Sequence, residues 1–194
     1  MPDKFKNRYT IRSARLPGYD YSQNGMYFTT ICTKDKEEFF GEIKNGEMIL
    51  NDIGKIVRKE LLQTPIIRKN VKLDRWVIMP NHLHVIIEII DQPNGVETPR
   101  KNWVETPRRG VSTMRGGYNP NWKPNSLGSI INQFKSVCTK RIWKTVPNIG
   151  FAWQSRFYDH IIRNDESLNK IREYIQTNPG MWERDRNNTE NIWM

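Results

Sequence analysis

Long hydrophobic runs are missing from this sequence. A membrane-spanning helix needs about 20 consecutive apolar residues, whereas the longest apolar stretch, residues 85–90, already contains Glu88. The first residues are charged and lack an apolar segment behind their basic side chains. These absences predict a protein with neither a signal peptide nor a transmembrane helix, which we expect in the cytoplasm.

Cysteine is also scarce. The 194 residues include only Cys32 and Cys138, and neither belongs to a CxxC pair. A cysteine-based metal site is therefore not indicated, and a disulfide is not expected in a reducing compartment. We expect both thiols to be small buried side chains.

Acidic residues are outnumbered by basic ones. The 21 Asp and Glu residues stand against 31 Lys and Arg residues, which gives a formal charge of +10. Trp, Tyr and Phe each occur seven times. Positive charge combined with many aromatic side chains suits a polyanion whose bases can stack, so a nucleic acid is the first candidate partner. Composition alone leaves open a basic soluble protein without such a partner.

The distribution of apolar residues predicts both strands and helices. Segments rich in β-branched and aromatic residues predict strands at 26–34, 71–79, 83–90 and 157–162, and the KNGE turn predicts a hairpin of 39–43 and 48–50. Helical spacing predicts one helix from Asn51 that stops at Pro65 and a second that begins at Ser126. A third is predicted to begin at residue 164 or 165 and to run to about 177, before the breaker Pro179-Gly180.

These elements predict an α+β fold with one main domain. Without the hairpin and the last helix, their order is βαββαβ, which is typical of a ferredoxin-like core with a largely antiparallel sheet. We expect helices on one sheet face and an open second face. The predicted main domain covers 26–178 and contains a flexible insertion at 91–125 that repeats VETPR. A basic N-terminal extension, 1–25, precedes it, and a polar tail, 179–194, follows it.

The stretch MPNHLHVIIEII contains two of the three histidines, His82 and His84, at the start of a predicted strand. Side chains two residues apart on a strand share a face. The two imidazoles are therefore either half-buried strand residues or ligands aimed at one divalent ion. Two ligands are too few for a metal site, so a third must come from elsewhere.

The predicted last helix offers a third ligand in IREYIQTNPG. Tyr174 and Asn178 are four residues apart and share one helix face. An asparagine carbonyl oxygen is a suitable ligand for a hard cation. The alternative is structural, with the tyrosine covering the core and the asparagine ending a helix before proline.

Three motifs in order, WVIMPNHLHVIIEI, QFKSVCTKRI and FYDHIIRNDESLNKIREYIQTNP, resemble the HUH-type single-tyrosine transposases. The resemblance is greatest to the REP-associated tyrosine transposase branch, which acts on single-stranded palindromic DNA. It covers about 26–178, apart from the insertion. It implies a ferredoxin-like core, His82 and His84 as metal ligands, Asn178 as the third ligand, Tyr174 as the nucleophile on a C-terminal helix, and Mg²⁺ or Mn²⁺ as the ion.

The resemblance also implies an activity, a single-strand DNA endonuclease and strand transferase that works as a monomer or homodimer. Attack by the tyrosine would leave a 5′-phosphotyrosine on hairpin or palindromic DNA.

Three cations in family-like motifs either contact phosphates or are ordinary solvated side chains: Lys135, Arg156 and Arg163. Tyr158 is a rival nucleophile. Two other functions remain open, a non-catalytic hairpin-binding module and a metal hydrolase with Glu88 as base.

Overall fold

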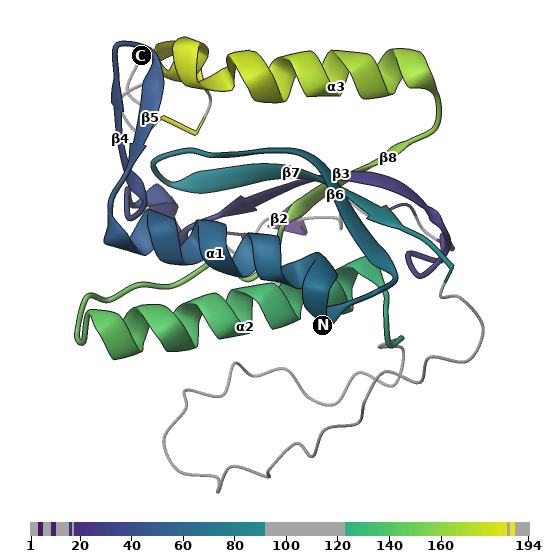
Figure 1. The fold of residues 1–194 in the computed structure, drawn as a ribbon, viewed down its shortest axis with the longest axis horizontal. Helices are drawn as coiled ribbons and strands as arrows, with labels where there is room; N and C mark the ends of the chain where they lie inside the picture. The colour runs from purple at the N-terminus through teal and green to yellow at the C-terminus, as the bar shows by residue number, and fades with distance from the viewer. Residues whose placement is uncertain are drawn as a thin grey trace, which may run out of the picture.

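The computed structural model describes residues 4–5, 9–10, 16, 18–91, 123–185 and 187–188. Its centre is an antiparallel sheet with the strand order β6-β7-β3-β8 (Figure 1). The four strands are β3 (Gly25–Cys32), β6 (Val71–Ile78), β7 (His82–Ile89) and β8 (Tyr158–Ile162). With α1 (Asp52–Ile67) after β3 and α2 (Leu127–Thr145) before β8, the predicted ferredoxin-like βαββαβ core is confirmed.

Helices cover both faces of this sheet (Figure 1). α1 and α2 lie on one face, and α3 (Asp165–Thr177) lies on the other. The expectation of an open second face is wrong where α3 covers it. The reason is the apolar stripe of α3, because Leu168 and Ile175 are buried against Phe28 and Ile86.

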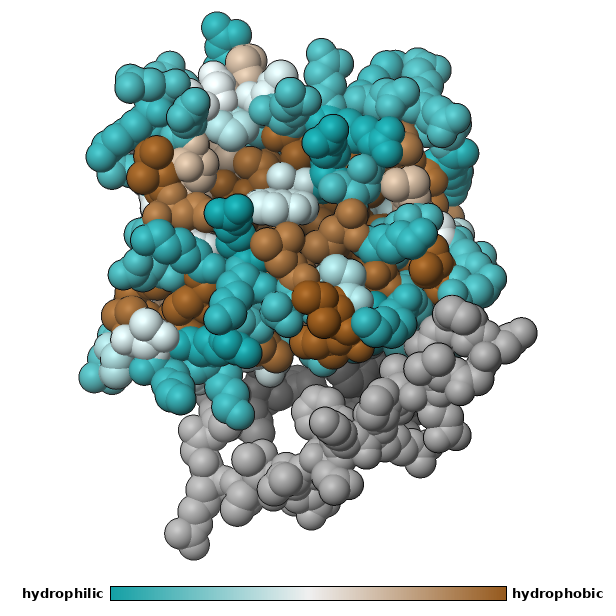
Figure 2. All heavy atoms as spheres, in the orientation of Figure 1, coloured by the Kyte–Doolittle hydropathy of each residue, from teal (hydrophilic) through white to brown (hydrophobic). Residues whose placement is uncertain are grey.

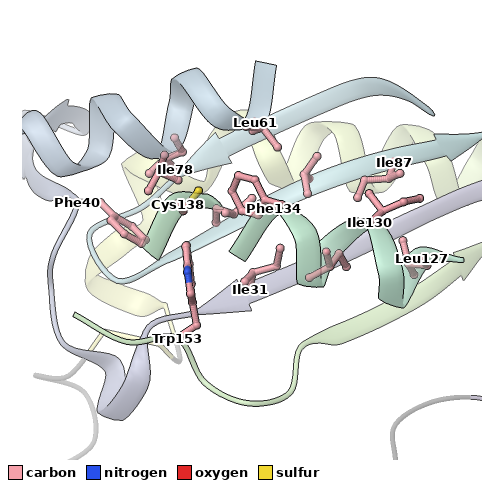
Figure 3. Packing of buried hydrophobic residues seen from close by; sticks show 14 of the residues in the cluster. Ile31, Phe40, Leu61, Ile78, Ile87, Leu127, Ile130, Phe134, Cys138 and Trp153 are labelled. Atoms are coloured by element: carbon pink, nitrogen blue, oxygen red, sulfur yellow. The ribbon is translucent and has the colours of Figure 1, made fainter. Parts of the chain in front are cut away.

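The larger core fills the space between the sheet and the helix pair α1 and α2. Figure 3 shows α2 pointing Ile130, Phe134 and Cys138 toward the strands, with Leu61 of α1 beside them. Burial of this apolar surface is the main favourable term in folding. In the orientation of Figure 1, Figure 2 shows hydrophobic residues gathered in the band between α3 and α1, whereas the outer surface of α3 is mostly hydrophilic.

Local sequence signals define the element ends. Asn51, Ser126 and Asn164 are N-caps whose side chains accept backbone N–H bonds from Gly54, Ser129 and Ser167. The predicted hairpin is formed by β4 (Gly41–Lys44) and β5 (Glu47–Leu50), and both turn residues, Asn45 and Gly46, have positive φ.

Prolines end the helices less sharply than predicted. α1 continues past Pro65 to Ile67, because a proline in the last turn removes only one N–H from the helical ladder and Arg68 N–H still bonds Thr64 O. After α3 the chain continues as a 3₁₀ helix, η2 (Asn178–Arg184), in spite of Pro179. This continuation directs the residues that follow back toward the sheet.

The remaining elements are short. A 3₁₀ turn, η1 (Lys34–Lys36), follows β3, and β1 (Lys4–Phe5) pairs with β2 (Tyr9–Thr10). A bulge between Leu73 and Trp76 interrupts the pairing of β6 with β7. The predicted insertion at 91–125, with its VETPR repeat, lies almost wholly outside the described residues, as do about half of the N-terminal extension and the end of the tail. No helix of the described part is long and apolar enough to cross a membrane.

Candidate metal and nucleophile site

His82 and His84 open β7 and point to the sheet face that carries α3. The antiparallel register places His82 opposite Cys32 and His84 opposite Thr30 of the central strand β3. Both imidazoles are buried. Their Nε2 atoms are 3.0 Å apart, and the rings meet edge to face with centroids 4.6 Å apart. The structure therefore brings the two side chains to one point.

Polar neighbours hold the outer nitrogen of each ring. Nδ1 of His82 lies 2.8 Å from Oδ1 of Asn81, and Nδ1 of His84 lies 2.9 Å from the hydroxyl of Thr30. Metal-binding histidines are commonly oriented in this way by a hydrogen bond at the second ring nitrogen. The contacts leave the two Nε2 atoms directed at each other.

The spacing of the two Nε2 atoms fits a shared divalent ion. Ligands at right angles around an ion with bonds of about 2.1 Å stand about 3.0 Å apart, and the observed separation is 3.0 Å. Imidazole nitrogen and carboxylate oxygen are both normal ligands for Mn²⁺ and Zn²⁺. The donor set and its spacing are therefore suited to a metal ion.

A carboxylate completes this group. Oδ2 of Asp185 lies 3.9 Å from Nε2 of His82, and one ligand atom from each of His82, His84 and Asp185 falls within 4.8 Å of the others. All three residues are buried. Asp185 follows η2, and its Oδ1 accepts the backbone N–H of Asn187. Sequence reasoning missed this residue because it lies in a tail without apolar periodicity.

Asn178, the third ligand implied by the resemblance, lies beside Asp185. Its Nδ2 donates to Oδ2 of Asp185 over 3.3 Å. Its carbonyl oxygen, Oδ1, is buried and has no hydrogen-bond partner among the residues that the structure describes. A buried acceptor without a partner is costly, and a cation would satisfy it. The ligand role of Asn178 remains a prediction.

Tyr174 extends from α3 to the same point. Its hydroxyl lies 3.2 Å from Nε2 of His84, and its ring packs edge to face on Phe28 and His84. The residue is 41% exposed, so part of the tyrosine is open to solvent. The predicted nucleophile and the predicted metal ligands thus come together within one chain.

The three predicted DNA-contacting cations have different environments. Arg156 and Arg163 are exposed at the two ends of β8. Lys135 is only 6% exposed, and its ammonium donates to the carbonyl oxygens of Gln154 and Arg156. Burial lowers the pKa of Lys135 to about 8. The contacts of Lys135 support a structural role, and its contact with DNA stays a prediction.

An open hollow of about 500 Å³ adjoins the site on the same sheet face. Phe28, Tyr158 and His160 line it from the sheet, and residues of the first two turns of α3 line it from the other side. Phe28 also contacts the ring of Tyr174. Because Tyr158 is 42% exposed, the hollow presents an aromatic surface next to Tyr174.

The fold resembles that of a solved transposase. A REP-associated tyrosine transposase bound to a REP hairpin aligns with a TM-score of 0.50 and 19% identity, over 85% of this chain and 72% of that chain. A proposed transposase of Deinococcus radiodurans aligns with a TM-score of 0.39 and 14% identity, over 84% of this chain and 95% of that chain. The chain therefore has the fold of a REP-associated tyrosine transposase.

One relative places the chain in a family. A protein of Haemophilus influenzae described as uncharacterized is 41% identical over 177 residues, which make up 90% of this chain and 91% of that protein. The chain belongs to the same family as this protein. No protein-family model matches it.

Proposed function

We propose that this protein is a transposase-type enzyme that cuts and rejoins single-stranded DNA through a tyrosine nucleophile. One observation carries the proposal: the Tyr174 hydroxyl lies 3.2 Å from Nε2 of His84, and this Nε2 lies 3.0 Å from Nε2 of His82. A nucleophile beside a pair of metal-binding nitrogens is the arrangement that phosphoryl transfer to a side chain requires.

The proposed ion is Mg²⁺ or Mn²⁺, held by His82, His84 and Asp185, with Asn178 as the further predicted ligand. The donor atoms of the first three lie within 4.8 Å of one another. When bound, the ion would polarise the scissile phosphate and offset the negative charge that develops on it. The carboxylate of Asp185 adds the hard oxygen that both ions prefer.

Tyr174 would perform the covalent step. Its oxygen bonds to phosphorus while the bond from phosphorus to the 3′ oxygen breaks, giving a 5′-phosphotyrosine and a free 3′ end. The phenol loses its proton and the departing 3′ oxygen gains one. Because one phosphodiester bond forms for each one that breaks, attack by a second 3′-hydroxyl reverses the step and joins two strands without another energy source.

The proposed substrate is single-stranded DNA with a hairpin or palindromic repeat. A formal charge of +10 suits such a polyanion. Exposed Arg156 and Arg163 flank β8, and the aromatic hollow lies beside that strand, so we propose phosphate contacts at the arginines and a base in the hollow. Tyr174 and both histidines belong to one chain, which supports a complete site in a monomer.

Incubation with a hairpin-bearing single-stranded oligonucleotide and Mn²⁺ tests the proposal. We expect a covalent protein–DNA adduct that disappears in Tyr174→Phe and on addition of a chelator. Tyr158→Phe is the matched control, since Tyr158 and Tyr174 are 42% and 41% exposed and both contact Phe28. Salt-sensitive hairpin binding without an adduct, unaffected by chelator, would instead identify a non-catalytic binding module.

A further inference from the structure

Asn81 is a wholly buried residue directly before β7, and the metal chemistry leaves its role unassigned. Its side chain makes three hydrogen-bond contacts. Oδ1 lies 2.8 Å from Nδ1 of His82, and Nδ2 donates to the carbonyl oxygens of Lys36 and Asn187 over 2.9 and 2.8 Å. The three contacts come from β7, from η1 and from the C-terminal segment.

These contacts determine which way the amide faces. Backbone carbonyl oxygens only accept hydrogen bonds, so the amide NH₂ group of Asn81 must be the donor to the carbonyl oxygens of Lys36 and Asn187. The amide oxygen then faces His82 and can only accept. Nδ1 of His82 must therefore carry a hydrogen, and in the neutral ring Nε2 has the lone pair.

We propose that Asn81 is a positioning residue that fixes the Nδ1–H tautomer of His82 and so keeps its Nε2 available to the metal. The inference rests on the proposed metal site. The backbone of Asn81 is held as well, because its carbonyl oxygen accepts from both the N–H and the hydroxyl of Thr33, at 2.8 and 2.9 Å. The asparagine is thus anchored on every side before any metal binds.

The tautomer of His84, unlike that of His82, is not fixed by its partner at Nδ1. Its Nδ1 partner is the hydroxyl of Thr30, which can donate or accept and therefore permits either tautomer. Without metal, the 3.0 Å contact between the two Nε2 atoms is a hydrogen bond only if His84 carries the hydrogen. Metal binding requires a lone pair on both nitrogens. We therefore expect His84 to change tautomer when metal binds, while His82 keeps its own.

The C-terminal segment contributes twice to this arrangement. Asp185 supplies the carboxylate beside Nε2 of His82, and the carbonyl of Asn187 accepts one of the two amide hydrogens of Asn81. Asn81 connects the docking of this segment to the state of His82, although Asn187 lies 106 residues after Asn81 in the sequence. A tail that sequence analysis treats as polar surface is in this way part of the metal centre.

The ¹⁵N NMR shifts of the histidine rings in the full chain test the inference at mildly alkaline pH. In the metal-free protein we expect Nδ1 of His82 and Nε2 of His84 to carry the hydrogens. With diamagnetic Mg²⁺, both rings should carry hydrogen on Nδ1. A metal-free His82 that is unprotonated at Nδ1 would overturn the proposal without any variant.

Two substitutions separate positioning from simple burial. Asn81→Leu removes the acceptor, and we expect His82 to lose its single tautomer and Mn²⁺ affinity to fall about 10–100-fold. Asn81→Asp keeps an acceptor and should keep the tautomer. Asn70→Leu is the control, because Asn70 is a buried asparagine beside the opposite end of β7. Unchanged His82 shifts and Mn²⁺ affinity in folded Asn81→Leu would refute the role.

These readouts do not depend on DNA chemistry. If the wild-type protein forms no adduct but shows the expected tautomers and Mn²⁺ binding, the proposed function fails and the role of Asn81 stands. If the adduct forms while His82 shows the opposite tautomer, the role of Asn81 fails and the function stands.

Discussion

The hydroxyl of Tyr174 lies 3.2 Å from Nε2 of His84. In the metal-free chain this nitrogen carries the hydrogen that faces His82, so the phenol oxygen can only accept from it; once the nitrogen binds a metal ion through its lone pair, it has no hydrogen left to donate and cannot accept from the phenol either. Metal binding at His84 should therefore release the tyrosine hydroxyl toward the substrate. The contact represents the metal-free arrangement of the proposed nucleophile beside the proposed metal site.

Tyr174→Phe should consequently leave metal binding intact. A lost hydrogen bond contributes about 1 kcal/mol, so we expect Mn²⁺ affinity to stay equal or to rise by up to about fivefold. The measurement is titration of the protein with Mn²⁺, with free ion detected by EPR. A tenfold fall in affinity would mean that the tyrosine helps to hold the ion, which contradicts the proposed role of Tyr174 as the nucleophile.

Asp185→Asn should weaken metal binding. The substitution removes a negative charge that lies within 4.8 Å of both histidine nitrogens, and we expect at least a tenfold loss of Mn²⁺ affinity, or about 1.4 kcal/mol. Glu183→Gln is the matched control, since Glu183 is an exposed acid of the same segment. Equal affinities in the two variants would remove Asp185 from the ligand set and leave Asn178 as the third ligand.

Tyr158→Ala should weaken binding of single-stranded DNA. Stacking of a base on an aromatic ring contributes about 1–3 kcal/mol by alanine substitution, so the dissociation constant should rise roughly 5- to 150-fold at fixed salt. Tyr158→Phe keeps the ring and should bind like the wild type. Fluorescence anisotropy with a labelled oligonucleotide measures both, and equal binding by the alanine variant would exclude the hollow as a base site.

Lys135 should make stability depend on pH. Burial lowers its pKa from 10.5 to about 8 in the folded chain, so between these values the unfolded chain binds the proton more tightly. The free energy of unfolding therefore rises with pH across this window, by up to about 3 kcal/mol, because the cost of burying the charge disappears. Denaturant unfolding of the wild type, compared with Lys135→Met from pH 8 to 10.5, isolates this contribution.

A constant difference between those two proteins would contradict the burial of the ammonium. Lys135 would then be hydrated, and the sequence-based prediction that it contacts DNA would gain support.

Local signals predicted most of the fold. The N-caps Asn51, Ser126 and Asn164, the Asn-Gly turn and the alternating strands are encoded within a few residues of where they act. The pairing of His82 with His84 follows from strand periodicity in the same way. Their proximity to Tyr174 was predicted through the resemblance, which related two segments about 90 residues apart.

Features that depend on tertiary packing were not predictable. The position of Asp185 depends on how α3 packs on the sheet and on the continuation of the chain as η2 past Pro179. Coverage of the second sheet face by α3 depends on Phe28 and Ile86, which the strand pattern alone does not distinguish from surface residues. No pattern within the tail marks Asp185 as different from its neighbouring acids.

Peptide mapping of the covalent adduct tests directly whether Tyr174 is the nucleophile. After reaction with a hairpin oligonucleotide, nuclease trimming and proteolysis, mass spectrometry should find one peptide that carries a nucleotide phosphate, and fragmentation should place it on Tyr174. A phosphate on Tyr158 or on any other side chain would contradict the role of Tyr174 as the nucleophile. Verified strand cleavage without any phosphate-carrying peptide would contradict it as well.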